Sequence, residues 1–356
     1  MINDDNHVAI IILNWNTWTD TVECLESVYK SDYKNFDIFL IDNKSDNDSI
    51  QRILSWANGM RDFDINSKIP HFVFPEIKKP IKVHIVNYNF AQRQIADIGV
   101  LKNNLPPGEL IFILNDENAG FAAGSNIGIK TVLDFCKSKY IFLLNNDTVI
   151  DKSAISELID KMEKNNIVLA NSILYDYYHP EKIVYAGAKF FPWAQTKYYR
   201  TIPNNLIRNS PFISGCTMMA KREVFEKYGL LTEKFFHGQE DFDFSWRLRK
   251  SGIKSACICS SKVYHKESIT LDTIMNKKRR IVLSYLDRVV NMRSYYNSLT
   301  WILWKIAVSL YYIYLFIRLA KCSLKESLTI VMKMSQITNK LECVDKFVFD
   351  SIIKDY

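Results

Sequence analysis

Short apolar runs and amphipathic segments alternate along the first half of the chain. Residues 8–13 form a continuous apolar run rich in β-branched side chains, which is typical of a buried parallel strand. Residues 20–30 follow with apolar side chains at helical spacing, and residues 36–41 form a second buried run. The alternation continues through strands at 110–114 and 140–144 and helices at 121–136 and 153–164. It predicts an α/β fold, in which helices cover both faces of a mostly parallel, Rossmann-like sheet.

Two segments depart from this alternation. Residues 58–108 contain five prolines and no steady periodicity, so we expect an insertion with one strand at 82–86. The helix before it is expected to run through Trp56, with Ser49 as its cap. From residue 167 onward the pattern predicts strand-like pieces at 167–175, 183–191 and 212–219 and short helices at 221–228 and 241–250.

Polar residues follow four of the predicted strands. The four clusters are Asn14-Trp15-Asn16, Asp42-Asn43, residues 115–118, and Asn145-Asn146-Asp147. Asn and Asp turn chains well, so each cluster alone predicts no more than a turn. The carboxyl ends of parallel strands meet at one edge of a sheet, however, and ligands bind there in open α/β folds. Four clusters at that edge therefore indicate a binding site.

Three glycines recur every four residues at the start of the predicted helix 121–136. Gly120, Gly124 and Gly128 would line one helix face. Such a face allows either close packing of the helix on the sheet or the close approach of a phosphate to the helix N-terminus. The spacing alone leaves both interpretations open.

Carboxylates at two places are candidates for chemistry. Asp147 ends a strand and could hold Mg²⁺ or Mn²⁺ against a diphosphate, although a lone Asp after a strand is usually part of a turn. His265 also follows a strand-like run, and it would be a metal ligand only if it faced Asp147. Otherwise it is an ordinary surface or core histidine.

Three acids fall within four positions at the start of another predicted helix. Glu240, Asp241 and Asp243 could serve the helix dipole, or one of them could be a general base. Phe242 and Trp246, four residues apart, mark the buried face of this helix. Asp241 lies one step before that face, where its side chain can project into a cleft. Asp243 lies one step after Phe242 and is expected to pair with the arginine four residues later.

Composition places the chain among ordinary globular proteins. It is 48% hydrophobic and 24% charged, which excludes disordered, collagenous and coiled-coil classes. The seven cysteines include no CxxC pair. Cys257 and Cys259 share one face of a strand-like run, so we expect buried thiols and a reduced, cytosolic compartment. The first residues are acidic where a signal peptide needs bases, so none is expected.

The basic excess lies in the tail. The whole chain carries +7, and residues 275–356 hold 14 Lys and Arg against 6 Asp and Glu, a net +8. Within residues 299–320 the charge-free run covers only 306–317, whose helical length of about 18 Å falls short of a bilayer core of roughly 30 Å. Aromatic residues and the basic run at 277–280 favour peripheral association with an anionic membrane. A packed helix or a dimer contact is the alternative, and no nucleic-acid module is recognised.

Seven segments in order resemble family-2 glycosyltransferases of the GT-A fold, near the bacterial rhamnosyltransferase-like group. The segments are IIILNWN, FLIDNKS, ENAGFAAGSNIGI, YIFLLNNDT, SGCTMMAKREVFEKYG, EDFDFSWRLRKSG and VYH. The resemblance implies a GT-A catalytic domain over residues 1–270, in which 58–108 is an insertion. Residues 271–356 would then be a helical, basic C-terminal region.

The resemblance also implies roles for individual residues. The positions that match donor-binding residues are Leu13, Trp15, Asp42, Asn118, Gly120, Phe121, Asn126, Asn146, Ser214 and Gly215. Asp147 stands in the family's DxD motif and would hold the metal, with Asn145 replacing the first acid and His265 completing the metal shell. Asp241 matches the catalytic base, with Glu240 and Trp246 on the acceptor side.

The implied activity is inverting, metal-assisted transfer of a hexosyl group, with Mg²⁺ or Mn²⁺ as cofactor. The donor would be a nucleoside-diphosphate sugar, dTDP-rhamnose or a UDP-hexose, and the acceptor a hydroxyl of a surface polysaccharide or a lipid-linked saccharide. The enzyme would act at the inner face of the cytoplasmic membrane, and a homo-oligomer is left open. The alternatives are a non-catalytic nucleotide-sugar-binding protein and a nucleotidyltransferase, which would need a basic, glycine-rich loop after the first strand.

Overall fold

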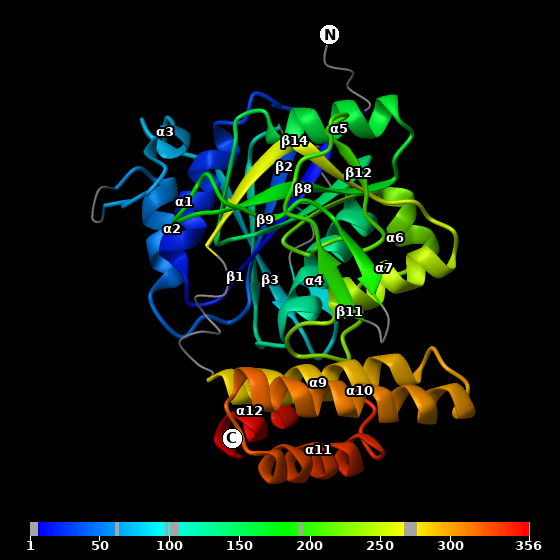
Figure 1. Ribbon diagram of the computed structural model, residues 1–356. Helices are drawn as coiled ribbons and strands as arrows, with labels where there is room; N and C mark the ends of the chain where they lie inside the picture. Colours follow the sequence, from blue (N-terminus) through cyan, green and yellow to red (C-terminus); the bar gives the residue numbers. More distant parts are fainter. Residues whose placement is uncertain are drawn as a thin grey trace.

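The structure is a computed structural model that describes residues 6–60, 64–96, 99, 107–191, 195–266 and 276–355. Across these residues a 12-stranded sheet forms the centre, a two-stranded ribbon lies beside it, and four C-terminal helices pack below it (Figure 1). The strand order along the sheet is β12-β14-β8-β13-β6-β1-β2-β5-β3-β4, with β7 paired to β14 and β9 to β8.

The N-terminal half of the sheet is parallel, as the alternation of strands and helices predicted. Its strands are β1 (Val8–Asn14), β2 (Phe36–Asp42), β3 (Val83–Asn89), β5 (Leu110–Asn115) and β6 (Tyr140–Asn145). The helices are α1 (Trp18–Tyr29), α2 (Ser49–Ala57), α4 (Phe121–Phe135) and α5 (Ala154–Lys164). Helices α1, α2 and α5 share one core with the sheet, and α4 shares the other. Burial on both faces explains why these strands read as unbroken apolar runs.

Beyond β6 the sheet becomes mixed. The strands are β7 (Thr148–Ile150), β8 (Leu169–Asp176), β9 (Ile183–Tyr185), β12 (Ile207–Asn209), β13 (Thr217–Lys221) and β14 (Ala256–His265). Strand β13 runs antiparallel between β6 and β8, and β14 runs parallel to β8. Helices α6 (Arg222–Tyr228) and α7 (Glu240–Lys250) follow β13. Every cysteine among the described residues is a free thiol, and Cys257 and Cys259 are buried in β14.

Three local predictions were wrong. The run at 183–191 is two strands, because Gly187 with φ +90° turns the chain between β9 and β10 (Ala188–Phe191), which pairs with β11 (Gln195–Tyr198). The strand expected at 212–219 begins only at Thr217. Ser49 is the first residue of α2 rather than its cap, since its hydroxyl donates to Asn47 Oδ1 at 2.6 Å and the cap position is taken by the residue before it.

The insertion at 58–108 extends the sheet at one edge. Its strand β3 pairs in parallel with β5, close to the strand predicted at 82–86. The short strand β4 (Gln94–Ile95) and the single-turn helix α3 (Pro70–Val73) were not foreseen. Parts of this insertion, at 61–63 and between 97 and 106, lie outside the described residues.

The glycine row of α4 serves close packing. A Cβ on Gly124 would lie 2.6 Å from Leu13, and one on Gly128 would lie 2.7 Å from Ile11, so both glycines let α4 press against β1. Gly120 precedes the helix with φ +92°, and a Cβ there would collide with the backbone oxygen of Phe236 at 2.2 Å. The packing interpretation of the four-residue spacing is therefore confirmed for the helical positions.

The C-terminal region is helical. It contains α9 (Lys277–Arg293), α10 (Ser298–Leu319), α11 (Leu324–Thr338) and α12 (Lys346–Asp355), which pack on one another below the sheet (Figure 1). Val344 forms a β-bridge with Phe235, just before α7. Lys278 in the basic run at 277–280 pairs with Glu326 of α11 at 2.6 Å. The proposed domain boundary at 270 falls in 267–275, outside the described residues, and stays a prediction.

Candidate active site

Side-chain hydrogen bonds join the polar clusters at the carboxyl edge of the parallel strands. Asn14 Nδ2 donates to Asp42 Oδ2 at 2.7 Å, which ties the end of β1 to the end of β2. Asn115 Nδ2 donates to Asn43 Oδ1 at 3.0 Å, and Asn43 Nδ2 donates to Asn118 Oδ1 at 3.0 Å. Three of the four clusters therefore form one polar network, as the topology argument predicted.

The fourth cluster joins the network through the first turn of α1. Asn146 Nδ2 donates to Thr17 Oγ1 at 2.7 Å and to Thr21 Oγ1 at 2.9 Å. Thr21 in turn donates to Asn14 Oδ1 at 2.7 Å. The loop after β6 is thus held beside the loop after β1. The sequence of either loop alone does not predict this contact.

Two predicted donor-binding residues, Asp42 and Asn126, hydrogen-bond to neighbouring loops of the chain. The Asp42 carboxylate also accepts from the backbone and the hydroxyl of Ser45, at 2.8 and 2.7 Å. Asn126 Nδ2 donates to Leu231 O and Glu233 Oε1, both at 2.9 Å, and its Oδ1 accepts from the Leu231 amide at 3.1 Å. Both side chains are buried and hold loops in place. Direct contact with a donor stays a prediction for both.

Other predicted donor-binding residues also lie at this edge of the sheet, outside the hydrogen-bond network described above. Trp15 follows β1 with 36% of its surface exposed, so its ring is available for stacking. Leu13 packs under α4, where it fills the space beside Gly124. Phe121 opens α4, and its ring lies within 3.9 Å of the point where a Cβ on Gly215 would stand. The loop at Ser214 and Gly215 therefore faces the N-terminus of α4.

Asp147 and His265 lie face to face, which was the condition for interpreting His265 as a metal ligand. Asp147 Oδ1 is 3.2 Å from His265 Nε2. The pairing of β7 with β14 sets this position, because His265 is aligned with Thr148. Burial lowers the pKa of His265, but Cys216 and Asp147 outweigh it and hold that pKa well above its ordinary value. His265 in turn outweighs the effect of burial on Asp147 and lowers the pKa of that carboxyl.

The donor set at this position fits a divalent cation. Asn145 Oδ1 is buried and has no hydrogen-bond donor among the described residues, so an amide oxygen is left over next to a carboxylate and an imidazole. Mg²⁺ is commonly held by one or two carboxylates and by substrate phosphates. Within the described ranges no group of three His, Cys, Asp or Glu side chains is arranged so that it could hold a metal ion, so the protein alone would supply an incomplete shell.

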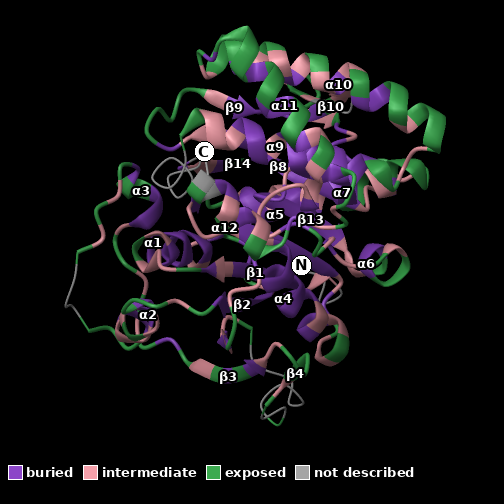
Figure 2. Cartoon of the chain, turned by 90° about the horizontal axis from the view of Figure 1, so that it is seen from below, coloured by how far each residue is buried: buried purple, intermediate pink, exposed green. Residues whose placement is uncertain are grey.

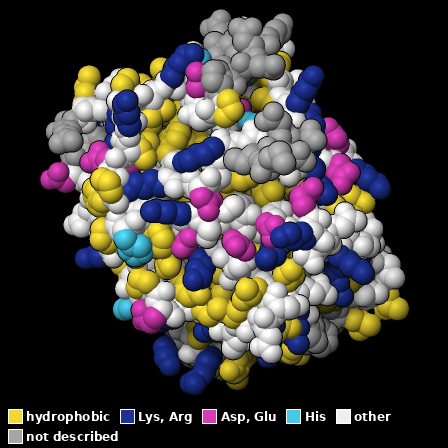
Figure 3. Space-filling view, turned by 90° about the horizontal axis from the view of Figure 1, so that it is seen from above, with side chains coloured by type: hydrophobic (Ala, Val, Ile, Leu, Met, Phe, Trp, Pro, Cys, Tyr) yellow, Lys and Arg dark blue, Asp and Glu magenta, His cyan; other side chains and the backbone are white. Residues whose placement is uncertain are grey.

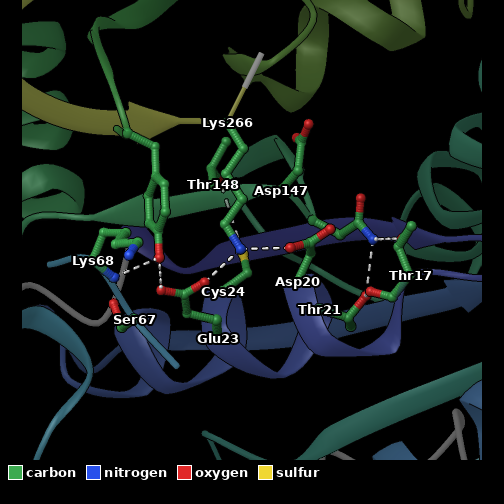
Figure 4. Close-up of polar contacts among 12 residues, drawn as sticks. Thr17, Asp20, Thr21, Glu23, Cys24, Ser67, Lys68, Asp147, Thr148 and Lys266 are labelled. Carbon is green, nitrogen blue, oxygen red and sulfur yellow. Dashed lines mark hydrogen bonds and ion pairs between the residues drawn. The ribbon is translucent and has the colours of Figure 1, made fainter. Parts of the chain in front are cut away.

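A buried lysine next to His265 was missed by the sequence analysis. Lys266 Nζ lies 2.5 Å from both Asp20 Oδ1 and Glu23 Oε2 on α1, and its backbone amide donates to Asp147 O at 3.0 Å (Figure 4). Tyr177 also donates to Glu23, at 2.6 Å. The ion pairs fix the end of β14, and hence His265, against α1. Two features of the sequence could have indicated these ion pairs: the acids three residues apart on α1, and the lysine directly after the candidate metal ligand His265.

A cleft of about 180 Å³ opens beside these ion pairs. It is lined by Trp18, Thr19, Asp20, Val22, Glu23, Asp64, Ile65, Asn66 and Lys266. Ligand pockets usually measure about 300–1,000 Å³. This cleft is therefore too small for a whole nucleotide sugar, and it borders the edge site rather than forming it.

Asp241 lies at the start of α7, against the loop that precedes β13. The Gly215 amide donates to Asp241 Oδ2 at 3.3 Å. The next residue of that loop, Cys216, accepts from the Asn145 amide at 2.9 Å. Two successive loop residues thus connect the candidate base with the candidate metal ligands. Phe242 is buried and stacks on Trp246, which is only partly buried. Phe244 and Leu248 are buried as well, so the buried side of α7 is wider than the predicted face.

Burial raises the pKa of both carboxyls at the start of α7. For Glu240 the neighbouring Asp241 raises it further, and for Asp241 the Gly215 amide offsets part of the effect of burial. Glu240 Oε2 and Trp246 Nε1 are buried without a hydrogen-bond partner among the described residues. A carboxylate with a raised pKa is a stronger base than an exposed one.

Asp243 pairs with Arg247, as predicted. Its Oδ2 pairs with Arg247 Nε at 2.9 Å, four residues along α7, and its Oδ1 accepts from Tyr295 OH at 2.5 Å. Tyr295 follows α9, so this carboxylate ties α7 to the C-terminal region.

Asp243→Asn is expected to lower the free energy of unfolding by about 1–3 kcal/mol, because it weakens two hydrogen bonds that involve a buried charge. Urea unfolding of the purified chain would measure the change, with the exposed Asp134→Asn as a matched control. Turnover should fall far less than in Asp241→Asn. An unchanged unfolding midpoint together with an equal loss of turnover would contradict the structural role.

Comparisons with known proteins agree with this architecture. Residues 100–229 match the family model "Glycosyl transferase family 2". A low-salt glycan biosynthesis hexosyltransferase, Agl10, from Haloferax volcanii is 23% identical over 198 residues, which cover 53% of this chain and 62% of the relative. The dTDP-rhamnosyl transferase RfbF from Shigella flexneri is 28% identical over 170 residues, 46% of this chain and 55% of the relative. The matches therefore span less than two thirds of either relative.

Two solved structures share the fold. GalNAc-T7, crystallised with UDP, GalNAc and Mn²⁺, has a TM-score of 0.51 at 14% identity, covering 81% of this chain and 51% of that one. The mannosyltransferase PcManGT from Pyrobaculum calidifontis, in complex with GDP-Man and Mn²⁺, has a TM-score of 0.51 at 11% identity, covering 98% of this chain and 85% of that one. The fold class predicted from the sequence is confirmed.

Proposed function

We propose that the chain is a family-2 glycosyltransferase, which the match of residues 100–229 and the two curated relatives support, and that on its GT-A fold it transfers a hexosyl group with inversion. The donor is a nucleoside-diphosphate sugar, dTDP-rhamnose or a UDP-hexose. The acceptor is a hydroxyl of a surface polysaccharide or a lipid-linked saccharide. One observation carries the proposal: a carboxylate, Asp241, is held by the Gly215 amide directly beside the edge where the polar strand ends converge.

The chain's own residues divide the work of such a transfer. Asp241 takes the proton from the acceptor hydroxyl, whose oxygen attacks the anomeric carbon in line, opposite the departing nucleoside diphosphate. A single displacement inverts the configuration at that carbon. Asp147 and His265, with Asn145 beside them, would hold Mg²⁺ or Mn²⁺. Such a cation, when bound by these residues, would supply stabilisation of the charge that develops on the leaving diphosphate.

The runner-up functions lack such support. A non-catalytic nucleotide-sugar-binding protein would not need a carboxylate placed as Asp241 is, held by the Gly215 amide beside the polar strand ends. A nucleotidyltransferase would need basic side chains after the first strand, and Asn14, Trp15, Asn16 and Thr17 carry no charge.

A donor screen tests the proposal. The full chain would be incubated with Mg²⁺ or Mn²⁺ and, in turn, dTDP-rhamnose, UDP-glucose, UDP-galactose and GDP-mannose, and release of nucleoside diphosphate would be measured. We expect slow hydrolysis of one donor class. Tight nucleotide binding without any release would instead favour the non-catalytic alternative.

We also propose that the C-terminal helices bind the cytoplasmic face of an anionic membrane. Figure 2 shows exposed positions along α10. Apolar residues at helical spacing are among them, so one face of α10 carries an exposed apolar stripe, which consists of Leu299, Leu303, Ile306, Leu310, Tyr314 and Ile317. This stripe lies in the region that carries the net +8 charge. On the opposite face of the molecule both signs of charge are interspersed (Figure 3). An apolar stripe within a basic region favours an anionic lipid interface.

The apolar helix α10 is longer than the charge-free run at 306–317 predicted. Among the described residues α10, with 22 residues, is the one helix long and apolar enough to cross a membrane by length and composition alone. Lys305, expected to interrupt it, turns inward and donates to Ser335 O at 2.8 Å and Asn339 Oδ1 at 2.7 Å. However, the same inner face buries Trp304 and Phe316 against the neighbouring helices. Surrounding α10 with lipid would break these contacts, so an interfacial position is favoured.

Vesicle flotation tests this second proposal. The wild-type chain is expected to float with vesicles that contain anionic phosphatidylglycerol and to be released by high salt or alkali. Leu303→Asp combined with Leu310→Asp should abolish flotation, whereas Gln51→Asp on the exposed face of α2 should not. Release by detergent alone would establish a true span and overturn the interfacial assignment.

A further inference from the structure

A short stretch of the C-terminal region is bonded to the loop that leads to the candidate base. Val344 forms its β-bridge with Phe235 in that loop. The Val344 amide donates to Lys234 O at 2.8 Å, and Val344 O accepts from the Phe236 amide at 2.8 Å. Val344 and Phe235 are each 1% exposed. Buried backbone hydrogen bonds therefore join the C-terminal region to the segment that precedes α7.

Helix α12 adds a side-chain contact at the same place. The rings of Phe349 and Phe236 lie 5.0 Å apart, centre to centre, and Phe349 is 7% exposed. Asp345 Oδ1 accepts from the Val348 amide at 3.0 Å, which fixes the first turn of α12. We call residues 344–349 the C-terminal strap, because they hold the loop by both its backbone and its side chains.

The loop held by the strap also contacts the start of α4. Phe236 O accepts from the Phe121 amide at 3.1 Å. A Cβ on Gly120 would lie 2.2 Å from the same oxygen, so the loop backbone touches the N-terminus of α4 directly. Phe236 thus uses its amide for the strap and its carbonyl group for α4. Any displacement of the strap would be passed on to the edge where the polar strand ends converge.

On its other side the loop enters α7 through a left-handed backbone. Gly238 has φ +84° and Gln239 has φ +65°, and Asp241 follows two residues after Gln239. A residue other than glycine in this conformation costs free energy, and it persists only where surrounding contacts enforce it. The Asp243 amide donates to Gln239 O at 2.8 Å, which enforces the conformation from the side of the helix. The strap holds the chain on the side of the loop.

We propose that the C-terminal strap is a positioning element, which holds the loop at 234–239 so that Asp241 stays directed at the polar edge of the sheet. This inference rests on the proposed transferase function. Val344 and Phe349 act through the loop, and Asp241 alone reacts. The C-terminal region is then required for turnover as well as for the membrane contact proposed above.

Hydrogen exchange of backbone amides tests the strap without any turnover. The full chain would be compared with Phe349→Leu, Phe349→Val and Phe349→Ala. The matched control is Phe347→Ala, which removes a ring of the same helix that is 81% exposed. We expect exchange at the Phe236 and Phe121 amides and at the start of α7 to rise from Leu to Val to Ala, by at least about tenfold in Ala. The control should match wild type.

The graded series keeps the test informative if the alanine variant does not fold, because leucine and valine leave smaller cavities at the same site. Faster exchange confined to α12, with the loop and the start of α7 unchanged, would overturn the strap.

Turnover separates a positioning role from a purely structural one. Phe349→Ala should lower kcat by about 10- to 100-fold well below its unfolding midpoint, since a small misplacement of a reacting group is costly. Phe349→Leu should restore most of this loss, and Phe347→Ala should leave kcat unchanged. A lower midpoint with an unchanged kcat of the folded chain would overturn the positioning role. Failure of the proposed function would show separately, as a wild-type chain that releases no nucleoside diphosphate from any donor.

Discussion

Replacing Asp241 by Asn is expected to lower turnover by roughly 10²–10⁴-fold, the range that a general base contributes. The substitution removes the group that accepts the acceptor proton but keeps the size of the side chain and an oxygen for the Gly215 amide. Donor binding and thermal stability should therefore barely change. Turnover would be measured by release of nucleoside diphosphate at a saturating acceptor concentration.

The pH profile gives an independent check on the same residue. Burial raises the pKa of Asp241, and the Gly215 and Phe242 amides and Arg288 offset only part of this shift. The base works when deprotonated, so the rate should rise with pH through a range above that of an exposed carboxyl. Asp241→Asn should lose this rise. Equal turnover in the variant and wild type would remove Asp241 from the mechanism and leave Glu240 as the candidate.

Asp147→Ala is expected to lower turnover by about 10²–10³-fold, because a metal ion is worth several kcal/mol of charge stabilisation on the leaving group. The same variant should lose binding of Mn²⁺, which electron paramagnetic resonance measures without any turnover. His265→Ala should have a smaller effect on both readouts, since the carboxylate carries the charge that attracts the cation.

Two controls make the metal prediction specific. Asp134→Ala removes an exposed carboxylate of α4, far from the strand ends, and should change neither Mn²⁺ binding nor turnover. An excess of chelator should abolish turnover of the wild-type chain, and added Mg²⁺ or Mn²⁺ should restore it. Undiminished transfer in chelator would refute metal dependence.

Much of the site follows from order along the chain. Apolar runs that end in Asn14, Asp42, Asn115 and Asn145 predict parallel strands, and parallel strands bring their carboxyl ends to one edge by topology alone. The pairing of Asp243 with the arginine four residues later follows equally from the pitch of a helix. These predictions needed only the spacing of apolar and charged residues along the chain.

Contacts between distant segments needed the tertiary structure. The pairing of β7 with β14 brings His265 to Asp147, and the end of β14 brings Lys266 to the acids of α1. No periodicity links these segments, because the contact depends on which strands become neighbours in the sheet. The same is true of Asn126, whose amide is used by a loop more than a hundred residues away.

The C-terminal region shows most clearly which features the sequence indicates and which ones only the tertiary structure decides. Its composition alone indicates a basic helical segment with an apolar stretch, and the structure contains that segment as α9 to α12. The burial of Arg288 against α7 and the inward turn of Lys305 are set by helix packing. Net charge counts every lysine and arginine alike, whereas packing decides which of them meet solvent, a lipid surface or a substrate. Sequence therefore determined the elements and their chemistry, and the tertiary structure decided which side chains face one another.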